Sequence, residues 1–552
     1  MSVFAILAGT IAILLSAYRF YGSFIARKLG LDNRNITPAH TQNDGIDYVP
    51  SNRFVVLGHH FASIAGAGPI IGPIIAVSFG WIPALLWIII GGIFFGAVHD
   101  ITSMTASLRH RGKSIGEIIQ QYIGDSGKKL FLIFAFATLL LVIAVFMDIV
   151  ARTFVTVPAA ASASVFFILL ALIFGMAINR LGAPLWISSI GGVGLLYFFV
   201  YLGEIFPFQT SYGVWISILV AYIFMAAVTP VSILLQPRDF LNSFLLYGMI
   251  LFGVAGVLVG NPNIEMTAAV HFQVENLGFL FPVLFVTVAC GAISGFHSLV
   301  ASGTTSKQID QEEDVKIIGF GGMLIETLLA VMAVMAVAVM TRDDFAARLA
   351  VVGPVTLFSE GLGGFISSIG IPISVAISFV ALTVSAFALT TLDTCTRLAR
   401  FIIQEYTEDI PASAVKSLLQ NRHVATALVV ILSGLLLLTG RFEQLWPIFG
   451  SANQLLAALA LLAGTVWLAK MKVNPLFTVI PMVFMFSVTL LSLLIFAWNQ
   501  YLQNAWFLSV LSVSLFVLAV ILVVMARNSL RQFYEEDKRR QTKTGVKSVS
   551  SA

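Results

Sequence analysis

The sequence predicts an all-α polytopic membrane protein, and three observations carry that prediction. Of the 552 residues, 58% are hydrophobic and only 11% are charged, whereas a soluble domain carries about 25% charged residues. Many apolar runs reach the roughly 20 residues that a helix needs to cross the hydrocarbon of a bilayer. These runs are continuous rather than alternating, which excludes the strands of a transmembrane β-barrel.

About 15 transmembrane helices follow when span length and hydropathy are applied along the chain. They are expected over residues 3–20, 54–79, 81–107, 130–156, 164–179, 183–202, 212–234, 241–260, 278–300, 316–340, 366–391, 424–440, 446–469, 475–498 and 506–526. The first segment is expected to stay in the protein as a helix, because no small-residue cleavage site of a signal peptide follows it.

These spans divide the chain into five parts. The parts are an N-terminal helix with a cytoplasmic loop (1–53), a first half (54–277), a second half (278–470), extra C-terminal helices (471–526) and a cytoplasmic tail (527–552).

Positively charged residues in the short loops predict the orientation. Arg109 and Arg111 follow the third predicted span, and Arg397 and Arg400 are assigned to the loop after the eleventh. The loop 261–277, on the other side, contains no Lys or Arg. Because cytoplasmic loops are enriched in these residues, the N-terminus is predicted to lie outside the cell and the C-terminus in the cytoplasm.

Residues 54–80 form an apolar segment that is long enough to span a membrane, yet its middle disfavours a regular helix. Helix-breaking residues crowd there, namely Gly66, Gly68, Pro69, Gly72 and Pro73. A glycine costs roughly 1 kcal/mol and a proline about 3 kcal/mol in a helix interior, and a membrane has no water to satisfy the freed backbone groups. We therefore predict a discontinuous helix beside a polar site.

A second apolar segment, 278–307, is interrupted in the same way at Gly291, Ser294 and Gly295, just before His297. In the predicted topology the two segments run in opposite directions, which is typical of an inverted-repeat transporter. A five-plus-five repeat would place them five spans apart, whereas the predicted spans place them seven apart. Either two helices are inserted in the first half, or the predicted spans are wrong there.

Six strings carry a resemblance to a known family. They are HHFASIAGAGPIIGP (59–73), GGIFFGAVHD (91–100), QPRDFLN (236–242), CGAISGFHSLVASGTTSKQ (290–308), FALTTLDTCTR (387–397) and WPIFGSANQLLAALAL (446–461). Together they resemble the carbon starvation protein A family, over about residues 50–470. The resemblance implies uptake of peptides, or in some members pyruvate, by carbon-limited bacteria. It also implies a LeuT-type five-plus-five core with extra helices, as in the amino acid–polyamine–cation superfamily.

The two interruptions are the predicted substrate site. Free N–H groups and the positive end of a half-helix suit a carboxylate, which peptides and pyruvate both carry. The candidate substrate-binding residues are His59, His60, Ser63, Gly66, Ala67, Gly68, Ser294, Gly295, His297 and Ser298. The alternative is that the glycines only permit close packing of helices, although such packing does not require the prolines.

Ionisable and hydroxyl side chains within the spans are the candidates for coupling transport to an ion. They are His60, His99, Asp100, Glu326, Thr390, Thr391 and Asp393. The histidines can relay a proton because their charge changes near physiological pH. The last three come from the resemblance, since the corresponding helix of a five-plus-five core often supplies hydroxyls to a sodium site.

Each of these residues also has a structural interpretation. Asp100 could pair with Arg109 or Arg111 at a helix end, and the residues around Asp393 could form a plain helix cap. Asp148 and Arg152, four residues apart, predict a structural ion pair within one helix. Two further polar residues, Asn453 and Gln454, are either contacts between helices or gate residues.

We therefore predict a secondary active transporter that imports peptides across a bacterial inner membrane, driven by protons or alternatively by sodium. Import of pyruvate or another small carboxylate is the alternative substrate. A membrane sensor is the alternative of another class. An enzyme is not expected, because the spans contain neither HExxH nor GxSxG. We expect no cofactor, no resident metal and no nucleic-acid partner. The expected partners are the substrate and the lipid bilayer.

Overall fold

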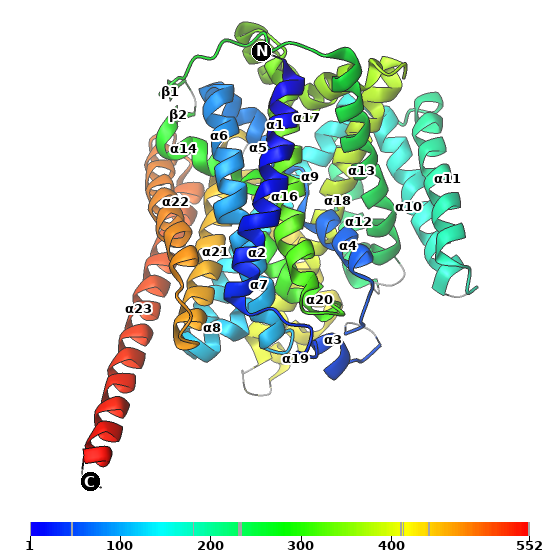
Figure 1. Ribbon diagram of the computed structural model, residues 1–552. Helices are drawn as coiled ribbons and strands as arrows, with labels where there is room; N and C mark the ends of the chain where they lie inside the picture. Colours follow the sequence, from blue (N-terminus) through cyan, green and yellow to red (C-terminus); the bar gives the residue numbers. More distant parts are fainter. Residues whose placement is uncertain are drawn as a thin grey trace.

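Long helices lie side by side in the computed structural model, with the N-terminus at one end of the bundle and helix α23 leaving the other (Figure 1). The structure describes residues 2–45, 48–179, 181–229, 234–275, 277–408, 411, 413–439 and 442–549. In this part the only strands of more than one residue are a short antiparallel pair, β1 (Gln273–Val274) and β2 (Gly278–Phe279).

The first half of the chain is a run of helices up to the strand pair. They are α1 (Val3–Ser16), η1 (Ala17–Gly22), α2 (Ser23–Leu29), α3 (Pro38–Thr41), α4 (Arg53–Ile64), α5 (Gly68–Ala76), η2 (Val77–Phe79), α6 (Trp81–Gly91), η3 (Gly92–Gly96), α7 (Ala97–Arg109), α8 (Ile115–Ile123), α9 (Asp125–Thr156), α10 (Pro158–Asn179), α11 (Leu185–Ile205), α12 (Tyr212–Val228) and α13 (Leu235–Gly260). Among these, η1 and η3 are π-helical segments within longer helices.

The second half continues with helices after the strand pair. They are α14 (Leu280–Val288), η4 (Ala289–Gly291), α15 (Gly295–Gly303), η5 (Thr305–Lys307), η6 (Lys316–Gly321), α16 (Gly322–Ala338), α17 (Arg342–Ser367), α18 (Ile373–Glu408), α19 (Ala414–Gln420), α20 (Arg422–Thr439), α21 (Phe442–Lys470), α22 (Leu476–Leu502) and α23 (Trp506–Val549).

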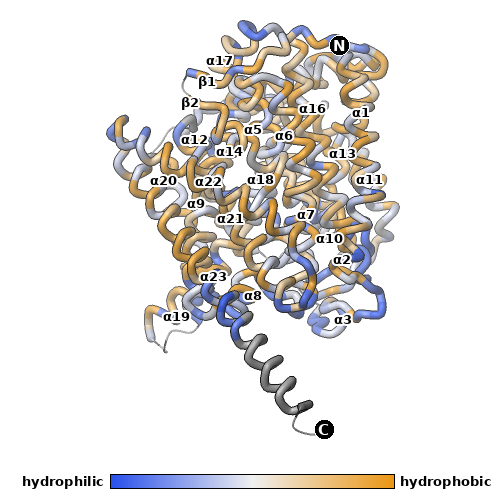
Figure 2. Tube along the Cα trace, turned by 60° about the vertical axis from the view of Figure 1, so that its left-hand side comes forward, coloured by the Kyte–Doolittle hydropathy of each residue, from blue (hydrophilic) through white to orange (hydrophobic). Residues whose placement is uncertain are grey.

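The prediction of an all-α polytopic membrane protein is confirmed. In the described part of the chain, 13 helices are long and apolar enough to cross a membrane, and the bent pair formed by α4 and α5 adds a fourteenth span. The hydropathy of the tube in Figure 2 agrees, because hydrophobic positions fill the middle of the bundle and hydrophilic positions gather at its two ends. The predicted count of about 15 spans stays a prediction.

One predicted span, 366–391, is wrong in its bounds. The structure places a helix end at Ser367 and starts the long helix α18 at Ile373. The preceding residues, predicted as a loop, form α17 instead, which bends at Gly353 where φ is 75°. The hydropathy pattern missed α17 because its first turn is charged, with Asp343 and Asp344 next to Arg342.

Both ends of α17 lie at the same end of the bundle, although its length and composition would allow it to cross (Figure 1). At its start, Arg342 Nη2 donates to the carbonyl oxygen of Ser78, 3.0 Å away at the end of η2. Beyond its other end, Ser368 packs against Gly260, the last residue of α13. The loop that follows α13 reaches η2 directly, since His271 N donates to Phe79 O at 2.9 Å. We infer that α17 covers this end of the bundle.

Several helices continue beyond the apolar stretch that predicted them. Helix α18 runs to Glu408, so Arg397 and Arg400 lie inside a helix rather than in the loop assigned to them. Both arginines are buried and donate to carbonyl oxygens at the C-terminus of α12, Arg397 to Ala226 at 3.1 Å and Arg400 to Ala227 at 3.0 Å. Cationic side chains stabilise the negative end of a helix in this way.

Helices α10 and α11 pack against each other at one side of the bundle (Figure 1). The outer surface of α11 is exposed at Trp186 and Ile190, as expected for side chains that meet lipid. These two peripheral helices lie between the two interrupted segments in the sequence. The insertion of two helices into a five-plus-five repeat stays a prediction.

Candidate functional site

The two predicted interruptions are present in the structure, and they meet. Helices α4 and α5 are bent by 48° across residues 65–67, which we call the first break. Helix α14 passes through η4 into residues 292–294, the second break, before α15 begins. The segments pack so tightly that a Cβ added to Gly72 of α5 would lie 2.4 Å from Thr287 O of α14.

The two interrupted segments run in opposite directions, as predicted. Ser51 N, just before α4, donates to Gln308 O at 3.0 Å, so the start of the first segment lies beside the end of the second. At the other end of the bundle, η2 lies beside the loop that leads into α14, through the bond from His271 to Phe79. The helix-breaking residues in the sequence therefore located both breaks, and the predicted order of spans gave their relative direction.

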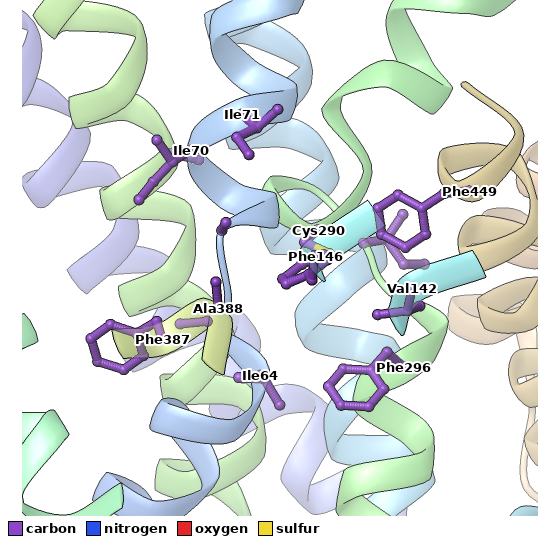
Figure 3. Packing of buried hydrophobic residues seen from close by; sticks show 14 of the residues in the cluster. Ile64, Ile70, Ile71, Val142, Phe146, Cys290, Phe296, Phe387, Ala388 and Phe449 are labelled. Carbon is purple, nitrogen blue, oxygen red and sulfur yellow. The ribbon is translucent and has the colours of Figure 1, made fainter. Parts of the chain in front are cut away.

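Apolar side chains surround the breaks (Figure 3). Ile64 and Ile70 flank the first break, and Phe146 of α9, Phe296 of α15 and Phe449 of α21 lie close by (Figure 3). A Cβ at Gly66 would lie 2.5 Å from Thr391 Oγ1, and one at Gly68 would lie 2.6 Å from Cys290 Sγ. The glycines at the first break are therefore required by close packing as well as by the bend.

Asn453 of α21 supplies the polar contact at the second break. Its Oδ1 accepts a hydrogen bond from Phe296 N at 3.0 Å, at the N-terminus of α15, and its Nδ2 donates to Ser294 Oγ at 3.0 Å. The next residue, Gln454, donates to Phe285 O of α14 at 2.7 Å. Both residues, whose role the sequence left open, hold the second interrupted segment against α21.

The hydroxyl candidates on the interrupted helices bond to their own backbones. Ser63 Oγ donates to His59 O at 2.9 Å, and Ser298 Oγ donates to Gly295 O at 2.7 Å. A hydroxyl that donates to a carbonyl of its own helix competes with the backbone hydrogen bonds and often bends the helix, which agrees with the position of both serines next to a break. Ala67 is buried at the first break, where only its backbone offers polar groups.

A buried chain of four ionisable side chains joins α7, α15 and α16. We call His99, Asp100, His297 and Glu326 the histidine–carboxylate chain. His99 Nδ1 lies 2.7 Å from Asp100 Oδ1, Asp100 Oδ2 lies 2.8 Å from His297 Nδ1, and His297 Nε2 lies 3.3 Å from Glu326 Oε2. All four side chains are fully buried. Asp100 thus pairs with histidines, and the alternative pairing with Arg109 or Arg111 is wrong.

The two histidines before the first break have different surroundings. His60 is fully buried, and its Nδ1 lies 2.9 Å from Thr305 Oγ1, just beyond α15. His59 points elsewhere, with its Nδ1 3.5 Å from Asp239 Oδ2 of α13. Adjacent residues on a helix point about 100° apart, so the two histidines contact different helices.

Thr390 and Asp393 of α18 face α13. The sequence analysis did not predict their partners on this helix, which are Asn242 and Arg238. Arg238 donates to Asp393 Oδ2 and to the hydroxyl of Tyr222, which itself donates to Asp393 Oδ2 at 2.9 Å. One turn further along α13, Asn242 Nδ2 donates to Thr390 Oγ1 at 2.8 Å. We call Tyr222, Arg238, Asp239 and Asp393 the arginine cluster.

A signal for the arginine cluster was present in the sequence. Arg238 and Asp239 begin an apolar span, and an ionisable residue there marks a functional hypothesis. The family-like string QPRDFLN contains both of them, yet its sequence does not indicate which helix they face. By contrast, the predicted pair of Asp148 and Arg152 is confirmed, with Arg152 Nε 2.7 Å from Asp148 Oδ2.

A clamp of loop residues closes the end of the bundle near the start of α4. Glu312, buried in the loop after α15, accepts hydrogen bonds from Asp32 N at 2.9 Å and Asn35 Nδ2 at 2.7 Å. Its other oxygen lies 2.6 Å from Arg109 Nε, at the end of α7. The segment before the first interrupted helix is thereby joined to the segment after the second.

In the described residues, no group of three or more His, Cys, Asp or Glu side chains is arranged to hold a metal ion. Cys290 and Cys395 are both buried and free.

The fold and the site define a polytopic α-helical membrane protein of the transporter class. A model of the family described as Carbon starvation protein CstA matches residues 2–351 and 346–492. The chain belongs to this family, and the resemblance seen in its sequence strings is confirmed.

Named relatives cover most of the chain. It is 34% identical to "Peptide transporter CstA" of Escherichia coli (strain K12), over 85% of this chain and 77% of that protein. The counterpart of the same name in Campylobacter jejuni is 32% identical, over 89% of this chain and 80% of that protein. "Pyruvate/proton symporter BtsT" of Escherichia coli is also 32% identical, over 92% and 84%.

Among solved structures, a manganese transporter of Eremococcus coleocola aligns with 91% of this chain and 100% of its own, at a TM-score of 0.47 and 12% identity. At this distance the similarity carries no argument about function or about an internal repeat.

Proposed function

We propose that this chain is a secondary active transporter that imports peptides across a bacterial inner membrane, coupled to protons. One observation carries the proposal: two interrupted helices of opposite direction meet in the buried centre of the bundle. Interrupted helices place half-helix ends and unpaired backbone at membrane depth, which a membrane protein tolerates only beside a cavity or within protein. Relatives named peptide transporters, at 32–34% identity, support the same function.

The substrate lies between the two breaks in this proposal. The N-terminus of α15 attracts a carboxylate, and Asn453 holds Phe296 N until a substrate carboxylate takes its place. The buried aromatic side chains of Phe146, Phe296 and Phe449 next to the breaks (Figure 3) would suit the side chains of a peptide better than the small methyl group of pyruvate.

The histidine–carboxylate chain carries the coupling proton in this proposal. His297 is the third residue of α15, so its charge acts directly on the half-helix that faces the substrate. Its two ring nitrogens face Asp100 and Glu326, which makes it a bridge along which a proton can pass. His60, on the other interrupted segment, contacts Thr305 of η5, just beyond the C-terminal end of α15.

The five-plus-five repeat and the orientation belong to the same proposal. Setting the peripheral pair α10 and α11 aside leaves five spans from the first interrupted segment to the second. The distribution of Lys and Arg favours an N-terminus outside the cell and a C-terminus in the cytoplasm. The clamp around Glu312 then closes the cytoplasmic end.

Import of pyruvate is the second candidate, and it is favoured by the relative named pyruvate/proton symporter, at 32% identity. The same half-helix end would hold its carboxylate. A sensor or an enzyme has less support, because the relatives are named transporters.

The test is uptake into proteoliposomes that contain the purified protein. Labelled dipeptide and labelled pyruvate are compared under an imposed proton gradient, an imposed sodium gradient and no gradient. We expect dipeptide to accumulate only with the proton gradient. Accumulation of pyruvate alone would make the second candidate correct, and no accumulation of either substrate would contradict a transport function.

A further inference from the structure

Three buried charges meet where α13 packs on α18. The side chain of Arg238 is 1% exposed, and those of Asp239 and Asp393 are fully buried. One nitrogen of the guanidinium, Nη1, bonds to Asp393, and the other, Nη2, donates to Asp239 Oδ1 at 3.2 Å. A buried carboxylate requires a compensating positive charge, and here a side chain of the protein supplies it.

Oxygen atoms from three helices, α12, α13 and α18, surround this guanidinium. Besides the two carboxylates, the hydroxyl of Tyr222 bonds to Arg238 and to Asp393. Within the described part of the chain, three buried oxygens of the facing residues have no hydrogen-bond partner, namely Asp239 Oδ2, Asn242 Oδ1 and Asp393 Oδ1. Carboxylate, amide and hydroxyl oxygens are the ligands that a hard cation takes.

Helix α18, which carries Asp393, also contacts the first break. Thr391 of this helix lies against Gly66, which follows Ala65, the C-cap residue of the half-helix α4. On α4 itself, His59 Nδ1 lies 3.5 Å from Asp239 Oδ2. In transporters with interrupted helices, the C-terminal ends of half-helices are where coupling cations bind, because they carry partial negative charge.

We propose that Arg238 is a built-in cation that takes the place of a coupling sodium ion at Asp393. This inference rests on the proposed function and deepens it, since it makes transport independent of sodium. An arginine stays charged at every physiological pH, and it cannot leave the site during transport. The positive charge that would hold α18 to the half-helix α4 is thus permanent, so no sodium ion is needed at Asp393, and the proton of the proposed function remains to drive accumulation.

The test compares sodium with choline, an organic cation too large for the site. For the wild type, dipeptide uptake and the melting temperature are expected to be the same in both salts. In Arg238→Ala the two carboxylates lose their partner, so we expect low stability in choline and a rise of the melting temperature by about 5 °C in saturating sodium. Uptake by this variant is expected to need sodium.

Two further variants are controls. Arg152→Ala removes an arginine from an ion pair within α9, and neither its stability nor its uptake is expected to depend on sodium. Arg238→Met combined with Asp239→Asn and Asp393→Asn removes all three buried charges, so this triple variant is expected to fold in choline.

The proposal is overturned if wild-type uptake requires sodium, if sodium raises the wild-type melting temperature, or if Arg238→Ala behaves alike in both salts. The comparison of wild-type uptake and melting temperature between sodium and choline tests the proposal even if no variant can be purified. The melting temperature needs no substrate, so a sodium effect on Arg238→Ala still supports the cation site if uptake of every tested substrate fails. A failure of uptake for every tested substrate would contradict the proposed transport function but not the cation site at Asp393.

Discussion

His297 is the residue at which the proposed proton path and the proposed substrate site meet. It stands in the first turn of α15, and its ring bridges Asp100 of α7 and Glu326 of α16. A fully buried histidine between two acids holds them together when it is protonated and separates from one of them when it is neutral. A change of charge here therefore alters how α15 packs against α7 and α16.

Replacing His297 with glutamine should uncouple transport from the proton gradient. The amide keeps a similar size and can still donate a hydrogen bond, but it cannot take up a proton. We expect proton-driven accumulation in proteoliposomes to fall about 10- to 100-fold, while exchange of labelled for unlabelled substrate without a gradient persists.

His423→Gln is the matched control, because His423 is exposed at the start of α20. It should accumulate substrate like the wild type. If His297→Gln still responds fully to the proton gradient, the histidine–carboxylate chain is not the coupling path.

At the scale of elements, the contact between α5 and α14 depends on the absence of a side chain. A Cβ at Gly72 would lie 2.4 Å from Thr287 O and 2.6 Å from Val288 O. Both are backbone atoms, so the half-helices themselves would have to move apart. The interrupted helices can lie this close only because the residue at 72 is glycine.

Gly72→Ala should therefore lower both stability and transport. Overpacking of this kind typically costs about 1–3 kcal/mol of stability, and the displacement of the half-helices should reduce uptake at least about tenfold. Thermal unfolding in detergent and uptake by proteoliposomes measure the two effects.

Gly434→Ala provides the control within another helix, since nothing lies within 4 Å of a Cβ built at Gly434 of α20. That variant should match the wild type. Equal behaviour of the two alanine variants would show that close packing at Gly72 is not required.

At the scale of the whole molecule, α17 and the loop with the strand pair cover one end of the bundle, and α3 lies at the other (Figure 1). Three exposed residues offer labelling sites at these two ends of the bundle. They are Val351 of α17 (84% exposed), Phe272 beside β1 (74%) and Ile36 before α3 (73%). The two native cysteines are buried, so they give little background in a labelling experiment.

Single cysteines at these positions test the topology with a membrane-impermeant maleimide on intact cells. Val351→Cys and Phe272→Cys should both be labelled from outside, and Ile36→Cys only after permeabilisation. Protection of Val351→Cys on both sides would mean that α17 crosses the membrane, because residue 351 would then lie within the bilayer. Labelling of all three in the reverse pattern would mean that the orientation is inverted.

The sequence predicted the class of protein and both breaks because these features depend on local composition. Apolar runs of sufficient length, and glycine or proline within them, act through hydration and backbone energetics close to each residue. The same pattern failed at α17, where charged residues in the first turn hid a helix, and at α18, whose arginines looked like loop residues but cap α12.

The sequence did not predict which side chains on different helices contact each other. Asp100 and His297 are 197 positions apart, and Arg238 and Asp393 are 155 apart, so only the packed bundle brings them together. Hydrogen bonds and buried ion pairs depend on the direction and distance between two side chains. The spacing of residues along one helix determines neither quantity for a side chain on another helix. The sequence by itself therefore determined what kind of protein this is and where its helices break, whereas the tertiary structure alone decided which charges meet beside those breaks.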